Sequence, residues 1–208
     1  MTDAPSLLAY TLAAGLLALT PGLDTAMVLR TAAVGGARPA ALAALGIALG
    51  CLAWGALVSV GLGALIAASE VGFTLLKWMG AAYLLWVGLG LIVSPRGRFE
   101  ATGPDPARDG RDALRRGFLT NLLNPKVGVF YVTFLPQFVP AGASVAAWSF
   151  LLAAVHVLLS LLVFAVLIGA TVPVGRLLAR PAVLSTLDRL TGAVFVGFGV
   201  KLALARAG

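Results

Sequence analysis

The sequence predicts an all-α polytopic membrane protein, with six transmembrane helices arranged as two inverted three-helix repeats. Of its 208 residues, 60% are hydrophobic and only 11% are charged, whereas soluble domains are roughly half apolar and about a quarter charged. A soluble core of this size could not enclose so much apolar surface, so the lipid bilayer must cover the remainder. Two further observations support the arrangement: basic residues occur in alternate connections between apolar runs, and the two halves of the chain share landmarks.

Six apolar runs are long enough to cross the hydrocarbon core, which takes about 20 helical residues. They cover residues 5–29, 39–68, 73–93, 114–139, 145–172 and 187–205. The second run is longer than a bilayer requires, so we expect this helix to tilt or to protrude. The first run is preceded by Asp3 and by no Lys or Arg. A signal peptide needs a positive segment at this place, so we expect a retained helix.

Basic residues are concentrated in every second connection. Eleven of the 15 Lys and Arg residues follow the first, third and fifth runs: Arg30, Arg38, Arg96, Arg98, Arg108, Arg111, Arg115, Arg116, Arg176, Arg180 and Arg189. The second and fourth connections hold Glu70 and no basic residue. Because short cytoplasmic connections are enriched in Lys and Arg, the alternation places these three connections in the cytoplasm and both termini outside.

The longest polar stretch, residues 95–113, divides the chain into two halves. It contains three prolines and several glycines, a composition typical of a linker rather than of a folded domain. We therefore expect a first three-helix repeat over residues 1–94, a cytoplasmic linker over 95–113 and a second repeat over 114–208.

Corresponding runs in the two halves carry the same landmarks. Residues 77–83 (KWMGAAY) and 189–195 (RLTGAVF) both read as a basic residue, two further residues, Gly-Ala, one residue and an aromatic residue. The first run is interrupted by residues 20–22 (TPG) and the fourth by residues 124–126 (NPK). Each half has an odd number of spans, so the halves must have opposite orientations, as in many secondary transporters that bind substrate near the midplane. Chance similarity between Gly- and Ala-rich helices is the alternative.

Asp24 lies inside the first apolar run, where a carboxylate is expected to have a function and a polar partner. The cost of a charged side chain at mid-membrane is about 2.5–3.5 kcal/mol on insertion scales. Pro21 removes a backbone donor and Gly22 tolerates the resulting bend. Irregular backbone at this depth is tolerated only against protein or a water-filled cavity. Thr20, Pro21, Gly22 and Asp24 are therefore predicted to form one broken-helix site, and a purely structural buried Asp is the alternative.

Lys126 is the natural counter-charge to Asp24. It follows Pro125 at the position in the second half that corresponds to Gly22. A carboxylate and an ammonium group that face each other at this depth would match an amino-acid zwitterion. The alternatives are a structural salt bridge, or a Lys side chain that extends to the cytoplasmic interface. Asn121 and Asn124, one turn apart, could bond a substrate or the freed backbone.

Several other sequence features favour structural roles. Small residues four apart permit close helix packing, and we expect this of Gly46, Gly50, Gly55, Gly61 and Gly63 in the second run and of Gly80, Gly88 and Gly90 in the third. His156 and Cys51 are the only residues of their types. We interpret His156 as a packing residue rather than a proton relay.

The sequence also argues against several classes of function. One Cys and one His cannot form a zinc or haem site within the chain. There is no phosphate-binding Gly-Lys-Ser/Thr loop and no nucleophile–base constellation, so we expect neither an ATP-driven motor nor an enzyme, and no cofactor. The net charge of +7 could suggest a nucleic-acid partner. We expect none, because the basic residues follow a membrane topology.

The motifs resemble those of the lysine-exporter superfamily, most closely its branch of homoserine/threonine-type efflux proteins. The matching stretches are residues 20–24 (TPGLD), 28–30 (VLR), 46–50 (GIALG), 80–84 (GAAYL) and 117–126 (GFLTNLLNPK), and the final helix over 188–204 also fits. The resemblance covers essentially the whole chain. Its specific parts are the TPGLD and GFLTNLLNPK stretches.

This resemblance implies a protein of the bacterial inner membrane that exports amino acids or related metabolites, driven by the proton gradient. It also implies an inverted-repeat bundle that is often dimeric. By motif position, Asp24 and the triplet 124–126 are the implied functional residues. The family pattern commonly has a second proline where this chain has Leu23, so we expect a milder break in the first helix.

We therefore hypothesise a proton antiporter that exports a small amino acid by alternating access. Removal from water favours the neutral form of a carboxyl group, so Asp24 is the expected proton carrier, and Lys126 would hold the substrate carboxylate. One charge that moves down 100 mV supplies about 2.3 kcal/mol, whereas a tenfold substrate gradient costs about 1.4 kcal/mol. The alternatives are an exporter of an ion or a drug-like metabolite and a non-transporting membrane assembly subunit.

Overall fold

The computed structural model describes residues 4–68, 70–95, 110–140, 142–171, 177 and 180–204. Its elements are α1 (Ala4–Leu19), α2 (Leu23–Gly35), α3 (Ala37–Ala68), α4 (Glu70–Val93), α5 (Gly110–Leu122), α6 (Pro125–Phe134), the 3-10 helix η1 (Leu135–Phe138), α7 (Val145–Gly169) and α9 (Pro181–Leu204). No strand occurs in this part of the chain. The predicted all-α class is therefore confirmed for the described residues.

Within the described residues, three helices are long and apolar enough to cross a membrane unaided: Ala37–Gly61 of α3, all of α7 and all of α9. α1 and α2 qualify together as one broken span. The apolar stretch Lys77–Val93 of α4 is shorter. The predicted fourth span is built from α5, α6 and η1 in succession. Long apolar helices are thus established, whereas the full count of six spans remains a prediction.

Several predicted boundaries differ from those of the helices. α9 begins at Pro181 rather than at residue 187, because Pro is well suited to the first turn of a helix. Most of the predicted linker, residues 96–109, lies outside the described residues, as do residues 172 and 205 at the ends of the fifth and sixth predicted spans.

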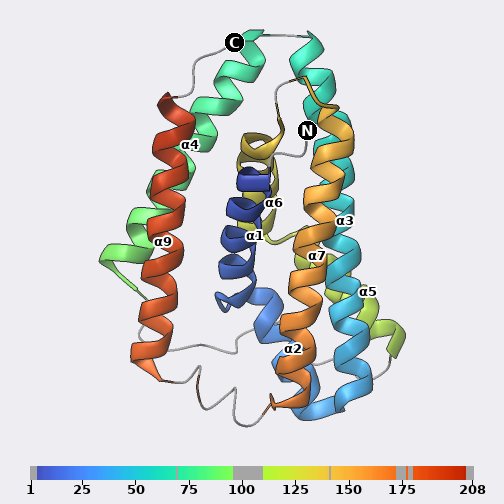
Figure 1. The fold of residues 1–208 in the computed structure, drawn as a ribbon. Coiled ribbons are helices and arrows are strands. Elements are labelled where there is room, and N and C mark those ends of the chain that lie inside the picture. The colour runs from blue at the N-terminus through green and yellow to red at the C-terminus, as the bar shows by residue number, and fades with distance from the viewer. Residues whose placement is uncertain are drawn as a thin grey trace.

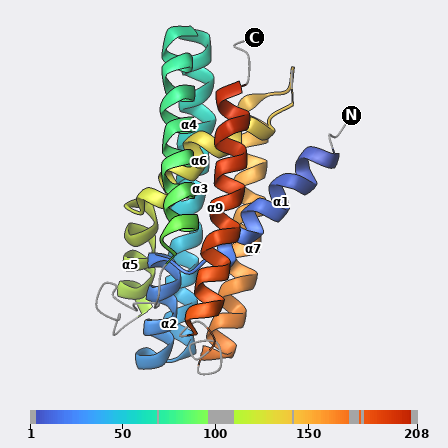
Figure 2. The same ribbon diagram turned by 90° about the vertical axis from the view of Figure 1, so that its left-hand side faces the viewer.

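Two pairs of long helices flank the broken ones. α3 packs along both α7 and α5, and α4 packs along α9. Figure 1 shows α1 and α6 in the centre, between the α4–α9 pair and the α3–α7 pair. In Figure 2 the N-terminal end of α1 leans away from the bundle. α1 begins and α9 ends towards the same end of the molecule, the upper end in Figure 1.

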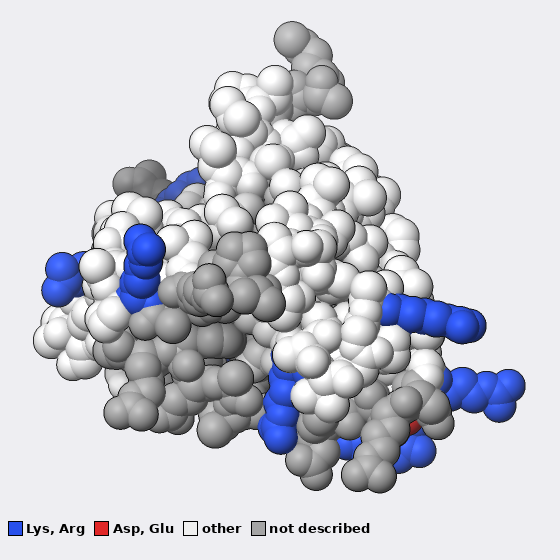
Figure 3. Space-filling view, turned by 90° about the horizontal axis from the view of Figure 1, so that it is seen from below, with Lys and Arg blue, Asp and Glu red and all other residues white. Residues whose placement is uncertain are grey.

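Arginines gather at the opposite end. The α2–α3 connection and the first turns of α5 and α9 lie there (Figure 1), and Figure 3, which views this end, shows Lys and Arg side chains around its edge. Exposed arginines in or near these segments are Arg38, Arg111, Arg115 and Arg180, and Arg189 follows two turns into α9. Asp112 pairs with Arg116 one turn away in α5, at 2.6 Å. The separation of charge has the form that the sequence predicts for a cytoplasmic end.

The break between α1 and α2 falls at the predicted interruption. The Thr20 hydroxyl donates to the Leu16 carbonyl at 2.7 Å, which closes the last turn of α1. Pro21 has no N–H with which to continue the helix. The backbone N–H of Ala26 donates to the Gly22 carbonyl at 2.9 Å and starts α2. The two axes differ by 50°, so one proline and one glycine suffice for a large bend although Leu23 replaces the second proline.

The break between α5 and α6 has a different local cause. Asn124 is the N-cap of α6, and its side-chain Oδ1 accepts from the backbone N–H of Lys126 at 3.1 Å. Pro125 occupies the first turn of the helix. An Asn cap followed by Pro is a strong start signal. The signal ends α5 at Leu122 and begins a new helix within the predicted span.

Glycines bring the packed helices into backbone contact. A Cβ atom on Gly46 would lie 2.0 Å from the Leu114 carbonyl oxygen, and one on Gly88 would lie 2.8 Å from that of Gly192. Tight positions among the predicted glycines are Gly46, Gly50, Gly55, Gly80 and Gly88, where close packing is confirmed. The prediction is wrong for Gly61 and Gly90, which have no such neighbour within 4 Å. The side-chain surroundings of Gly63 lie outside the described set.

Gly46→Ala is expected to destabilise the protein by about 1–3 kcal/mol, the usual cost of overpacking. The added methyl group would meet backbone of α5, which cannot rotate away as a side chain could. Thermal unfolding in detergent measures the effect. Gly61→Ala, in the same helix but in open space, is the matched control and should leave the transition unchanged. Equal stability of the two variants would contradict the close α3–α5 packing.

Candidate functional site

The two helix breaks meet in the middle of the bundle. Asp24, in the first turn of α2, accepts hydrogen bonds from Asn121 Nδ2 at 2.7 Å and from Asn124 Nδ2 at 3.3 Å. In the opposite direction, Lys126 Nζ donates to the Thr20 carbonyl oxygen at 3.2 Å. Thr20 follows directly after the end of α1, where carbonyl groups lack partners within the helix. Each break therefore supplies polar partners to the other.

Asn121 is held in place by α3. The residue is fully buried, and its Nδ2 also lies 3.3 Å from Cys51 Sγ. A Cβ atom on Gly50 would lie 2.6 Å from Asn121 Oδ1, so only glycine at this position leaves room for the amide. Oδ1 has no hydrogen-bond partner, and the two bonds that Asn121 makes both use the NH₂ group. This orientation presents a donor to the Asp24 carboxylate.

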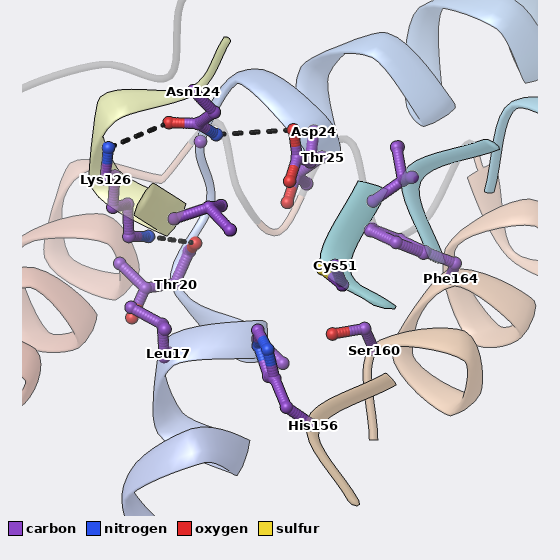
Figure 4. Close-up of a pocket in the computed structure, with 14 residues that line it drawn as sticks. Leu17, Thr20, Asp24, Thr25, Cys51, Asn124, Lys126, His156, Ser160 and Phe164 are labelled. Atoms are coloured by element: carbon purple, nitrogen blue, oxygen red, sulfur yellow. Dashed lines mark hydrogen bonds between the residues drawn. The ribbon is translucent and has the colours of Figure 1, made fainter. Parts of the chain in front are cut away.

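A small cavity lies between the two breaks and α7 (Figure 4). Thr20, Gly22, Asp24, Asn124 and Lys126 line it, and the remaining wall is formed by Leu17, Ala18, Thr25, Ile47, Cys51, Val127, His156, Ser160 and Phe164. Its volume is about 40 Å³. At roughly 10–15 Å³ for each water, this holds about three water molecules. A whole amino acid does not fit, so the cavity must widen before it can take one.

The predicted site residues thus occupy three kinds of position. Five of them line the cavity directly. Asn121 lies behind Asp24 and orients its carboxylate. Pro21 and Pro125 stand at the breaks themselves, where they interrupt the helices.

Other residues near the site were not singled out from the sequence. The Thr20 hydroxyl bonds to the hydroxyl of Thr191, which connects α9 to the first break. Asp188, three residues earlier in α9, is fully buried, whereas Asp24 is partly exposed to the cavity. The sequence signal that could have identified Asp188 and Thr191 is a polar residue in an otherwise apolar helix. Thr191 also lies within residues 189–195, the stretch that resembles residues 77–83 of α4. Within the described residues, no group of three or more His, Cys, Asp and Glu could hold a metal ion.

Two broken helices that bring opposite charges to a cavity inside a helical bundle are the architecture of a membrane transport protein. The chain belongs to the family of LysE type translocators, whose family model matches residues 16–206. This is a family of transporters and not of enzymes.

Curated relatives align along nearly the whole chain. A protein of Enterobacter sp. (strain 638) named leucine efflux protein is 34% identical over 199 residues, which cover 93% of each chain. A Salmonella typhi protein named homoserine/homoserine lactone efflux protein is 30% identical and covers 95% of this chain and 96% of its own. A Vibrio cholerae relative, described as an uncharacterized membrane protein, is 34% identical over 202 residues. No solved structure matches significantly.

Because Asn121 and Asp24 are hydrogen-bonded, their substitutions are expected to have non-additive effects on the free energy of unfolding. In a double-mutant cycle with Asp24→Ala and Asn121→Ala, we expect a coupling energy of about 0.6–1.7 kcal/mol, the range for hydrogen bonds between membrane helices. Reversible unfolding in mixed micelles provides the measurement.

The control cycle pairs Asp24→Ala with Ser59→Ala. Ser59 donates only to its own helix, at the Gly55 carbonyl, so these two changes should be additive within about 0.5 kcal/mol. Additivity in both cycles would mean that the bond between the breaks contributes nothing measurable.

Proposed function

We propose that the protein is a secondary exporter of an amino acid from the bacterial cytoplasm, coupled to protons by antiport and working by alternating access. One observation carries the proposal. Asp24 and Lys126, from the two helix breaks, line a single cavity in the interior of the bundle. Charged side chains are rare inside spanning helices and mark the paths of substrates and ions.

The charges of this cavity are complementary to a zwitterion. An amino acid would place its ammonium group at Asp24 and its carboxylate at Lys126. α6 begins beside the cavity at Pro125, next to Lys126, and the positive end of such a half-helix favours a carboxylate. The relatives named for leucine and for homoserine or its lactone support cargo of this class.

The proposal includes six spans in two inverted repeats, over residues 1–94 and 114–208. Both broken helices occupy corresponding places in the two halves. The close pairs α3–α7 and α4–α9 each join corresponding helices, an arrangement that is compatible with a twofold axis in the membrane plane. The arginine-rich end would face the cytoplasm and both termini the outside. A homodimer is part of the proposal on the strength of the family resemblance alone.

In alternating access, a contact that closes the path from the cavity to one side of the membrane must be able to open. A cluster of aromatic side chains between the cavity and the end of the molecule that holds the termini is the candidate for this contact. The Tyr10 hydroxyl donates to the Leu152 carbonyl oxygen at 2.8 Å, which fastens α1 to α7. The Tyr10 ring packs edge-on against Phe138 with centroids 5.3 Å apart, and Phe134 and Phe198 extend the cluster. Separation of α1 from α7 would break this closure and widen the cavity.

Asp24 is the proposed proton carrier. As a carboxylate it accepts from two Asn side chains and can bind an ammonium group. Once protonated it carries no charge, so its attraction to a cationic group is weaker. Proton binding from outside would therefore release the cargo, and proton loss to the cytoplasm would restore the site. One proton per substrate supplies enough energy for a neutral zwitterion.

Asp24→Asn is expected to abolish export driven by a pH gradient while the protein remains folded. The amide keeps the shape of the side chain but cannot exchange a proton. Efflux of labelled amino acids from proteoliposomes, with and without an imposed pH gradient, measures the loss. Asp112→Asn, the same change at the surface pair with Arg116, should export like the wild type.

The alternatives give different results. Full gradient-driven export by Asp24→Asn would refute Asp24 as the proton carrier. If folded wild-type protein exports no amino acid, the cargo is of another kind. Loss of folding in both Asp24→Asn and Lys126→Met, without any wild-type transport, would favour an assembly subunit.

A further inference from the structure

The inner face of α7 carries a polar stripe that the proposed coupling mechanism does not use. α7 is strongly apolar, yet Ser149, His156 and Ser160 all lie on its buried side. A polar side chain inside a spanning helix costs free energy unless it meets a partner. His156 and Ser160 line the cavity together with Asp24 and Lys126. Ser149 does not line the cavity and lies two turns of helix from His156.

His156 is held in a fixed orientation. Its Nδ1 lies 3.0 Å from the hydroxyl of Tyr131, which is itself fully buried. The imidazole also packs against the Phe130 ring, with centroids 5.3 Å apart. Only 4% of the residue is exposed. The contact with Tyr131 occupies Nδ1, so Nε2 is the ring nitrogen that could bond a group in the cavity.

Ser160 lies one turn further along α7. Figure 4 shows its hydroxyl and the His156 ring at the same cavity, with Asp24 and Lys126 carried by other elements. The cavity has two sides: the charged groups at the helix breaks and the hydrogen-bonding side chains of α7.

We propose that His156, assisted by Ser160, recognises the side chain of the cargo. This inference rests on the proposed function: with the charged groups of an amino acid bound at Asp24 and Lys126, its side chain is directed to the α7 wall. His156 and Ser160 then favour a neutral side chain with a hydroxyl or carbonyl group. They disfavour an aliphatic side chain of the same shape, because a buried polar group would lose its partner.

The test compares isosteric pairs of amino acids: threonine with valine, and homoserine with norvaline. The initial rate of transport of each labelled compound is measured in proteoliposomes. The readout is the ratio of the two rates within a pair. We expect wild-type protein to prefer the hydroxylated member. In His156→Leu this preference should fall about tenfold, the effect of roughly one hydrogen bond. His156→Gln, which can still donate, should retain part of it.

Two further variants separate recognition from structure. Ser160→Ala should reduce the same ratio of initial rates with a smaller change in packing. It therefore tests the inference even if His156→Leu does not fold. Ser149→Ala, on the same buried face but outside the cavity, should leave the ratio unchanged.

The outcomes distinguish a failure of this inference from a failure of the proposed exporter function. If folded wild-type protein transports neither member of a pair, the amino-acid exporter proposal fails. If it transports both and the ratio is the same in wild type, His156→Leu and Ser160→Ala, the exporter proposal stands. In that case His156 is a packing residue and the inference is overturned.

Discussion

Backbone groups that lose their helical partners inside a membrane are the constraint on which the rest of this structure depends. Hydrocarbon offers no water to satisfy them, so an interrupted helix needs another part of the protein. Here the two interruptions face each other: Lys126 reaches the carbonyl of Thr20, and Asn121 and Asn124 reach Asp24. The requirement of folding and the proposed transport site therefore use the same hydrogen bonds. Changes at these residues will affect stability as well as transport.

The remaining packing serves to hold the two breaks together. Gly46 and Gly117 allow backbone contact between α3 and α5, which brings the C-terminal turn of α5 and its Asn121 inwards. Gly50 then leaves the space that the Asn121 amide occupies. On the other side, Thr191 of α9 bonds to Thr20. The long helices thus form a frame around the two interrupted helices.

Much of this was readable in the sequence because its signals are local. Pro21 and the Asn124-Pro125 pair interrupt helices for reasons that involve only neighbouring residues, and a charge such as Asp24 is conspicuous in an apolar run. The α7 wall was not predictable, because a hydrophobic run does not reveal which side of its helix faces inwards. The interpretation of His156 as a packing residue rests on its place in an apolar helix. The small volume of the cavity and the burial of Asp188 were not predictable either. Both depend on how each helix is rotated about its axis, and contacts between segments distant in the sequence set that rotation.

The cargo is proposed to bind in the space between the two breaks. Cys51, the only cysteine of the chain, lines that space, so the unmodified protein carries its own reporter. The decisive measurement is the rate at which a small thiol reagent alkylates Cys51 in proteoliposomes, with and without saturating amino acid. Bound cargo should slow the reaction, and an amino acid that is not transported should leave it unchanged. An unaltered rate at concentrations that saturate transport would place the cargo elsewhere.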